Sequence, residues 1–114
     1  WACVHESDLS DQPENVDLAI QRASHIHARV GFDQGPQVPD PLASEWGTWT
    51  ERHLAWWQRI IDARKADGTE SLTITPEFGP PPYMPLNPKD GSPLADAWTI
   101  NFRFKNYLKM ALHP

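Results

Sequence analysis

Two histidines and an arginine alternate with apolar residues in one short segment, SHIHARVG. Successive side chains of a β-strand point to opposite faces, so His25, His27 and Arg29 would share one face. Imidazole nitrogens bind divalent transition metals, and a guanidinium binds anionic or polyhydroxyl groups. Burying such side chains is costly unless they have partners. The pattern therefore predicts a strand whose polar face carries chemistry.

A second alternating segment, SLTITPE, ends in an acidic residue. Thr73, Thr75 and Glu77 would share one face of this strand. A carboxylate can bind a divalent metal, act as a general base, or do both. Ligands of parallel α/β folds bind at the carboxyl ends of the strands. Because His27, Arg29 and Glu77 lie at or near such ends, we expect them to form a site.

Each of these residues also has an ordinary structural explanation. The two histidines could lie on a solvated edge strand, and Glu77 could be a surface carboxylate. Arg29 could pair with Asp33 or Asp40. Both predicted strands, however, end at long proline-rich loops, and such loops are more often functional than idle. The joint pattern favours a site.

The remaining histidines and the single cysteine are expected to be structural or inert. His53 lies at the edge of the apolar stripe of a predicted helix, which indicates a packing role. His5 and His113 are expected in a loop and in the C-terminal tail, and Cys3 has no basic partner in the sequence. The tryptophans around that helix indicate packing rather than a ligand cage. Phe78 and Tyr83 are candidates for the wall of a pocket.

A site of this kind needs two strands side by side. Apolar spacing predicts five elements: a helix over 13–23, a strand over 25–30, a helix over 48–67, a strand over 71–77 and a helix from 92. Alternation of this kind indicates a βαβ unit, and therefore an α/β fold with a parallel sheet. Two strands cannot close such a sheet. Their polar faces should need further strands, from this polypeptide or from another copy.

Local signals place the ends of these helices. Pro13 is favoured in a first helical turn. Thr48 and Glu51 match a capping box, and Gly68 supplies the stop of the same helix. The pair Ser92-Pro93 indicates the start of the final helix.

Composition limits the classes of function. The 114 residues suit one domain, and 10 Lys and Arg against 15 Asp and Glu give a net charge of −5. That balance argues against nonspecific binding to nucleic acid. No apolar run is long enough to span a bilayer, and no signal-peptide pattern is visible. The lone cysteine suits a reducing compartment, so we expect a cytoplasmic protein. Because the chain begins at Trp1, we expect a processed start or a longer parent protein.

The segments SHIHARVG, QGPQVPDP and ITPEFGPPPY, with the tryptophan-rich helix between them, resemble xylose isomerase-like TIM barrels. More narrowly, they resemble the sugar phosphate isomerase/epimerase family. The resemblance covers essentially residues 1–86, and the final helix fits the closing segment of a barrel less specifically. It implies that residues 1–114 are the C-terminal part of a single (β/α)8 barrel domain. The earlier strands, up to roughly the fifth, would be absent from this chain.

The resemblance also implies roles for individual residues. In that family the second histidine of such a strand binds a divalent metal, here His27 with Mn, Mg, Co or Zn. A glutamate that ends the next strand, here Glu77, is a metal ligand and often the base that transfers the proton. Arg29 and His25 would contact the substrate. Ketose 3-epimerases of this group place their substrate arginine several residues beyond the histidine, whereas Arg29 is only two residues away.

Three functions fit these observations. The first is a metal-dependent sugar or sugar-phosphate isomerase or epimerase, with a small sugar as its partner and no nucleic acid or membrane. The second is a metallohydrolase of the apurinic-site endonuclease type on the same barrel, which the acidic balance disfavours. The third is a non-catalytic metal-binding or interaction module, in which a second copy brings two sets of His27 and Glu77 together.

The isolated chain is expected to be inactive and to be poorly soluble, oligomeric or partly unfolded. Two parallel strands are too few for independent stability. The sequence also indicates that the polar residues of the two strands cannot satisfy one another's hydrogen bonds. These residues are His25, His27, Thr73, Thr75 and Glu77.

Overall fold

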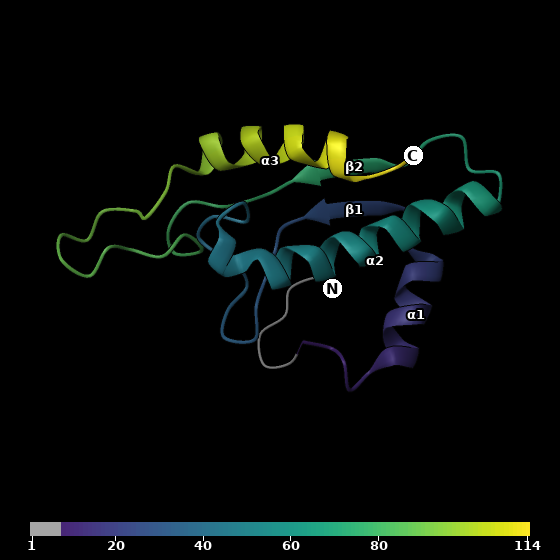
Figure 1. The fold of residues 1–114 in the computed structure, drawn as a ribbon, viewed down its shortest axis with the longest axis horizontal. Helices are drawn as coiled ribbons and strands as arrows, with labels where there is room; N and C mark the ends of the chain where they lie inside the picture. The colour runs from purple at the N-terminus through teal and green to yellow at the C-terminus, as the bar shows by residue number, and fades with distance from the viewer. Residues whose placement is uncertain (1–7) are drawn as a thin grey trace.

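The computed structural model describes residues 8–114 as a two-stranded parallel sheet with helices on one face (Figure 1). The elements are α1 (Pro13–Arg22), β1 (His25–Ala28), the 3-10 helix η1 (Ser44–Trp46), α2 (Gly47–Ala66), β2 (Thr73–Pro76) and α3 (Ala97–Ala111). This order confirms the predicted α/β class and its parallel βαβ unit. Among the described residues the sheet has only these two strands. The structure therefore contains one βαβ unit, and it does not contain the further strands of a barrel within residues 8–114.

The register of the sheet aligns the polar residues of the two strands. His25 pairs with Thr73, and His27 pairs with Thr75. β1 is shorter than the predicted strand over 25–30 because the backbone turns after Ala28. There the N–H of Arg29 donates to the carbonyl of His27 at 3.1 Å, which draws the chain out of the sheet.

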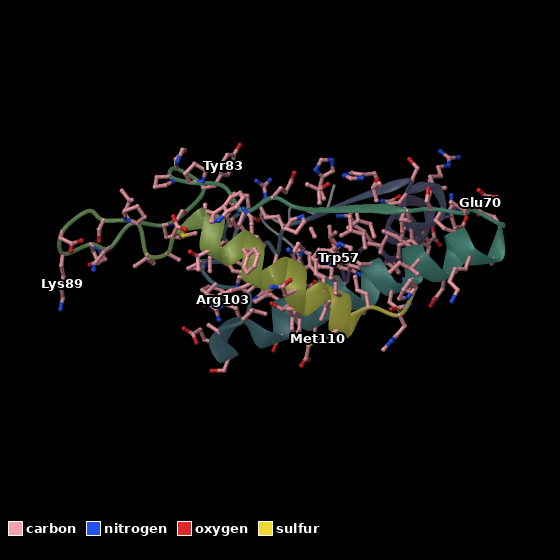
Figure 2. All side chains as sticks on the ribbon, turned by 90° about the horizontal axis from the view of Figure 1, so that it is seen from above. Trp57, Glu70, Tyr83, Lys89, Arg103 and Met110 are labelled. Atoms are coloured by element: carbon pink, nitrogen blue, oxygen red, sulfur yellow. The ribbon has the colours of Figure 1, made fainter. Side chains whose placement is uncertain are left out.

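A single apolar core lies between the sheet and the two long helices. Trp57 of α2 and Phe104 of α3 are almost fully buried, and their ring centroids lie 6.0 Å apart. Ile26 and Ala28 contribute the apolar face of β1. Figure 2 shows Trp57 in the middle of the molecule, between the strands and the helices. Burial of large apolar side chains such as these is the main force that holds the two layers together.

The predicted capping box at the start of α2 is wrong. α2 begins at Gly47, so Thr48 lies inside the first turn, and no side chain caps the helix. η1 leads directly into α2, which fixes the direction of the first turn through the backbone. The hydroxyl of Thr50 donates to the carbonyl of Pro41 at 2.7 Å and ties the same turn to the preceding loop.

The predicted stop of α2 at Gly68 is confirmed. The helix ends at Ala66, and Gly68 has a φ of 81°, in the left-handed region that favours glycine. The N–H of Thr69 donates to the carbonyl of Arg64 at 2.9 Å, and that of Gly68 donates to the carbonyl of Lys65 at 3.2 Å. These bonds satisfy carbonyls that the helix itself leaves open.

The predicted start of α3 at Ser92-Pro93 is wrong, because those residues belong to a loop that projects from the molecule (Figure 1). The N–H of Asn87 donates to the carbonyl of Ser92 at 2.7 Å, and that of Leu94 donates to the carbonyl of Pro85 at 2.9 Å. These bonds hold the chain in a narrow, extended loop with Lys89 at its far end (Figure 2).

α3 instead begins at Ala97 behind a different cap. The carboxylate of Asp96 accepts a hydrogen bond from the N–H of Thr99 at 2.8 Å. Asp96 therefore takes the N-cap role that the sequence pattern gave to Ser92. Within residues 8–114, no helix combines the length and the apolar character that crossing a membrane requires.

Candidate functional site

His27 and Glu77 meet on the exposed face of the sheet, at the carboxyl ends of β1 and β2. Nδ1 of His27 lies 2.5 Å from Oε2 of Glu77. A carboxylate only accepts, so Nδ1 carries the proton in this pair, and in the neutral ring Nε2 carries the lone pair. The side chain of His27 is 62% exposed and that of Glu77 is 32% exposed, so both groups are accessible to a ligand.

The same face pairs His25 with Thr73. Nδ1 of His25 lies 2.5 Å from the hydroxyl oxygen of Thr73, and the rings of His25 and His27 meet edge to face at 4.6 Å. The contact of His25 with Thr73 joins β1 to β2, as the contact of His27 with Glu77 joins β1 to the residue directly after β2. The prediction that the polar residues of the two strands cannot satisfy one another is therefore wrong for these two pairs.

Arg29 lies beside Glu77 and under an aromatic ring. Its Nη2 is 3.8 Å from Oε1 of Glu77, and its guanidinium carbon is 4.9 Å from the ring centroid of Tyr83. The side chain of Arg29 is only 16% exposed. Asp40, one alternative partner suggested by the sequence, instead pairs with Arg103 at 3.5 Å. The carboxylate of Glu77 thus faces an imidazole with one oxygen and a guanidinium with the other.

The two aromatic candidates for a pocket wall have different positions. Tyr83 is half exposed and covers Arg29, so it borders the site. Phe78 is buried in the core, where its ring contacts Phe104 edge to face at 5.4 Å.

Two amide side chains that the sequence reasoning missed hold the chain directly after Glu77. Gln37 bonds both polar groups of Gly79, and Asn101 bonds both polar groups of Phe78. A lone glutamine in a loop and a lone asparagine in a helix carry no motif. Their roles depend on contacts 42 and 23 residues away in the chain, so no local signal reveals them.

His53 is buried in the core and contacts backbone through both ring nitrogens. Nδ1 donates to the carbonyl of Trp49 at 2.8 Å, and Nε2 accepts from the N–H of Gly31 at 3.4 Å. This geometry agrees with the predicted packing role, although His53 lies at the centre of the buried stripe and not at its edge. His113 lies in the exposed C-terminal tail, as expected. Cys3 and His5 lie outside the described residues.

The chemistry of His27 and Glu77 fits part of a metal site. An imidazole nitrogen and carboxylate oxygens are ordinary ligands of divalent metals. Among residues 8–114, however, no cluster of three or more His, Cys, Asp or Glu side chains is grouped as a metal site would require. Two protein ligands leave most of a coordination sphere to water or to groups from elsewhere.

Comparisons with protein-family models, with curated proteins and with solved structures found no match to this chain. The features that the site offers are an exposed imidazole–carboxylate pair, a partly buried guanidinium beside it, and a tyrosine over that guanidinium.

Proposed function

We propose that the chain is part of a divalent-metal-dependent isomerase or epimerase that acts on a sugar or a sugar phosphate. The observation that carries the proposal is the contact between His27 and Glu77 at the carboxyl edge of the parallel strands. That edge is where parallel α/β folds place their catalytic groups. The sequence resemblance described above supports the same assignment.

The finer fold belongs to the same proposal. A parallel βαβ unit with helices on one face is the repeating unit of a (β/α)8 barrel. Further strands paired with the outer edges of β1 and β2 would enclose the polar face that carries His27 and Glu77. In this arrangement residues 1–114 form the C-terminal part of a xylose isomerase-like barrel.

His27 and Glu77 would hold the metal, and other parts of the barrel would supply the remaining ligands. In this conformation Nε2 of His27 faces away from Glu77 and is the ring nitrogen open to a metal, so Glu77 would bind the same ion only after its carboxylate leaves Nδ1. When bound, the ion supplies positive charge next to the carbonyl oxygen of the sugar, which stabilises the negative charge that develops there.

Glu77 would transfer the proton. A carboxylate can remove the proton from the carbon next to a carbonyl, and the resulting carboxylic acid can return it to the neighbouring carbon, which completes an isomerisation. Epimerisation would need a second acid on the opposite face of the sugar, supplied by another part of the barrel. Arg29 would bind a hydroxyl or phosphate group of the sugar, because a guanidinium donates several hydrogen bonds in one plane. His25, on the same face, would contact the substrate beside it.

Isotope exchange tests the proposal. The intact protein is incubated in D₂O with a panel of ketoses and aldoses and with Mn²⁺, Mg²⁺ or Co²⁺. Deuterium should enter the carbon next to the carbonyl of at least one sugar. Glu77→Gln should abolish the exchange, whereas Glu70→Gln, which changes an exposed carboxylate just before β2, should leave it unchanged.

Absence of exchange with every sugar and metal would overturn the assignment. Cleavage of abasic DNA that a chelator abolishes would point instead to a metallohydrolase on the same residues. The net charge of −5 argues against that outcome, because DNA-binding surfaces are basic.

A further inference from the structure

One buried side chain bonds both backbone polar groups of Gly79, its N–H and its carbonyl. The N–H of Gly79 donates to Oε1 of Gln37 at 2.7 Å, and Nε2 of Gln37 donates to the carbonyl of Gly79 at 3.0 Å. Gln37 is 1% exposed and lies in the loop that follows β1. Its amide thus joins the loop after β1 to the loop after β2. It donates to the carbonyl and accepts from the N–H of the same residue, as the backbone of a neighbouring strand does in a sheet.

The preceding residue is held in the same way from the other side. The N–H of Phe78 donates to Oδ1 of Asn101 at 2.8 Å, and Nδ2 of Asn101 donates to the carbonyl of Phe78 at 2.8 Å. Asn101 lies in the first turns of α3. Two consecutive residues therefore have all four of their backbone polar groups bonded to side-chain amides.

Glu77 lies between this double clamp and the last paired residue of β2. Pro76 pairs with Ala28 in the sheet, and the clamp begins at Phe78, so the backbone of Glu77 is fixed on both sides. We propose that Gln37 and Asn101 are positioning residues that hold the Glu77 carboxylate against His27. Groups that orient a metal-binding histidine or a catalytic carboxylate in this way often have large effects on affinity.

The clamp also determines where Tyr83 lies. A Cβ added to Gly79 would lie 3.0 Å from Cδ2 of the Tyr83 ring, so the ring passes unusually close to the backbone at this residue. The same ring covers the guanidinium of Arg29. Displacement of Gly79 would therefore move Tyr83 and with it Arg29, the neighbour of Oε1 of Glu77.

The contact between Glu77 and His27 can be measured whatever reaction the protein catalyses, whereas the effect of the clamp on metal binding rests on the proposed function. The test accordingly has two readouts. The first is the tautomer of His27, read from the ¹⁵N shifts of its imidazole at about pH 8, where an ordinary histidine is neutral. The second is the affinity for Mn²⁺ alone, measured by calorimetric titration.

The variants are Gln37→Leu and Asn101→Leu, each of which removes one clamp. The control is Gln58→Leu, because Gln58 makes the same two-way amide pairing with the backbone of His113 at 2.9 Å and 2.8 Å, away from the site. Each clamp variant should shift His27 from the Nδ1–H to the Nε2–H tautomer and weaken Mn²⁺ binding about tenfold. The control should leave both unchanged.

Each outcome decides one of the two proposals. Unchanged His27 tautomers in both clamp variants, or an equal shift in Gln58→Leu, would overturn the positioning role. A shifted tautomer in an intact protein whose wild type binds no Mn²⁺ would support the positioning role and count against the proposed function. If Gln37→Leu does not fold, Asn101→Leu gives the same decision, because the Asn101 amide is only partly buried.

Discussion

His27 and His53 show how the same residue type serves opposite purposes in this chain. His27 is largely exposed and has Glu77 at one ring nitrogen, whereas His53 is fully buried with backbone partners at both nitrogens. A histidine of the first kind can bind a ligand through the second nitrogen. A histidine of the second kind has no lone pair left for a metal while it remains in place.

Replacement of His27 by alanine should weaken Mn²⁺ binding at least about tenfold, because it removes one of the two candidate ligands. The free energy of unfolding should change by less than about 1 kcal/mol, because the side chain is mostly solvent-exposed. Calorimetric titration and urea unfolding measure the two quantities.

His53→Ala is the matched comparison and should do the reverse. Loss of a fully buried ring and of its two hydrogen bonds should lower the free energy of unfolding by about 2–4 kcal/mol. Mn²⁺ affinity of the folded fraction should stay unchanged. Loss of metal binding in His53→Ala together with normal binding in His27→Ala would contradict the assignment of β1 as the site strand.

The two ends of α2 respond differently to the same substitution. Gly68 has a positive φ, so Gly68→Ala places a Cβ in a strained conformation and should lower the free energy of unfolding by about 1 kcal/mol. Gly47 has helical angles and no heavy atom within 4 Å of an added Cβ. Gly47→Ala should therefore stabilise by about 0.5 kcal/mol. Thermal unfolding of both variants checks the predicted opposite signs.

The N-cap of α3 makes stability depend on pH. Hydrogen bonds from the backbone and side chain of Thr99 hold the pKa of Asp96 below its ordinary value of 3.8. The unfolded chain therefore binds this proton at a higher pH than the folded chain. The stabilisation is fully present above about pH 4 and is lost as the pH falls through the lower, folded pKa.

Melting temperatures measured from neutral pH down to about pH 2 test this effect. Asp96→Asn keeps the cap but does not titrate, so it should reduce the loss of stability below pH 4. Asp96→Ala should lower the melting temperature already at neutral pH. The pKa of Asp8 is also lowered, to about 2, mainly because its carboxylate accepts a hydrogen bond from the side chain of Ser10. Part of the acid dependence should therefore remain in both variants. An acid profile of Asp96→Asn identical to wild type would exclude the role of the cap.

The molecule as a whole exposes several large apolar side chains on α3 and on the loop that precedes it. These residues are Leu86, Leu94, Trp98, Phe102 and Met110. Met110 lies on the helical side of the molecule, opposite Tyr83 and the polar face (Figure 2). Exposed apolar surface of this kind promotes association in water.

The 114-residue chain alone should therefore have a mass above its own 13.0 kDa in light scattering. The double variant Trp98→Ser with Phe102→Ser should shift the mass towards the monomer, because it removes two of these side chains. Leu18→Ser is the control, since Leu18 is also exposed but lies on α1. A wild-type chain that is monomeric at the concentrations used for NMR would contradict the prediction.

The face on which the strand residues lie was predictable from the sequence, because the direction of side chains in a strand is a local property. Alternation placed His25 and His27 on one face of β1 and Thr73 and Thr75 on the same face of β2. Arg29 and Glu77 lie just beyond the ends of these strands, so their approach to each other was settled by the turns that follow. The parallel βαβ unit followed from the order of the elements. The stop at Gly68 followed from local chain geometry as well.

The contacts within the site were decided only by tertiary structure. Pairing of His27 with Glu77 depends on a register between strands 50 residues apart, and the clamp by Gln37 joins two loops 42 residues apart. The local signals at Thr48 and Ser92 failed for the same reason, since η1 and the projecting loop supplied other partners. A short segment encodes where its side chains point, but the neighbours they meet depend on how distant segments pack.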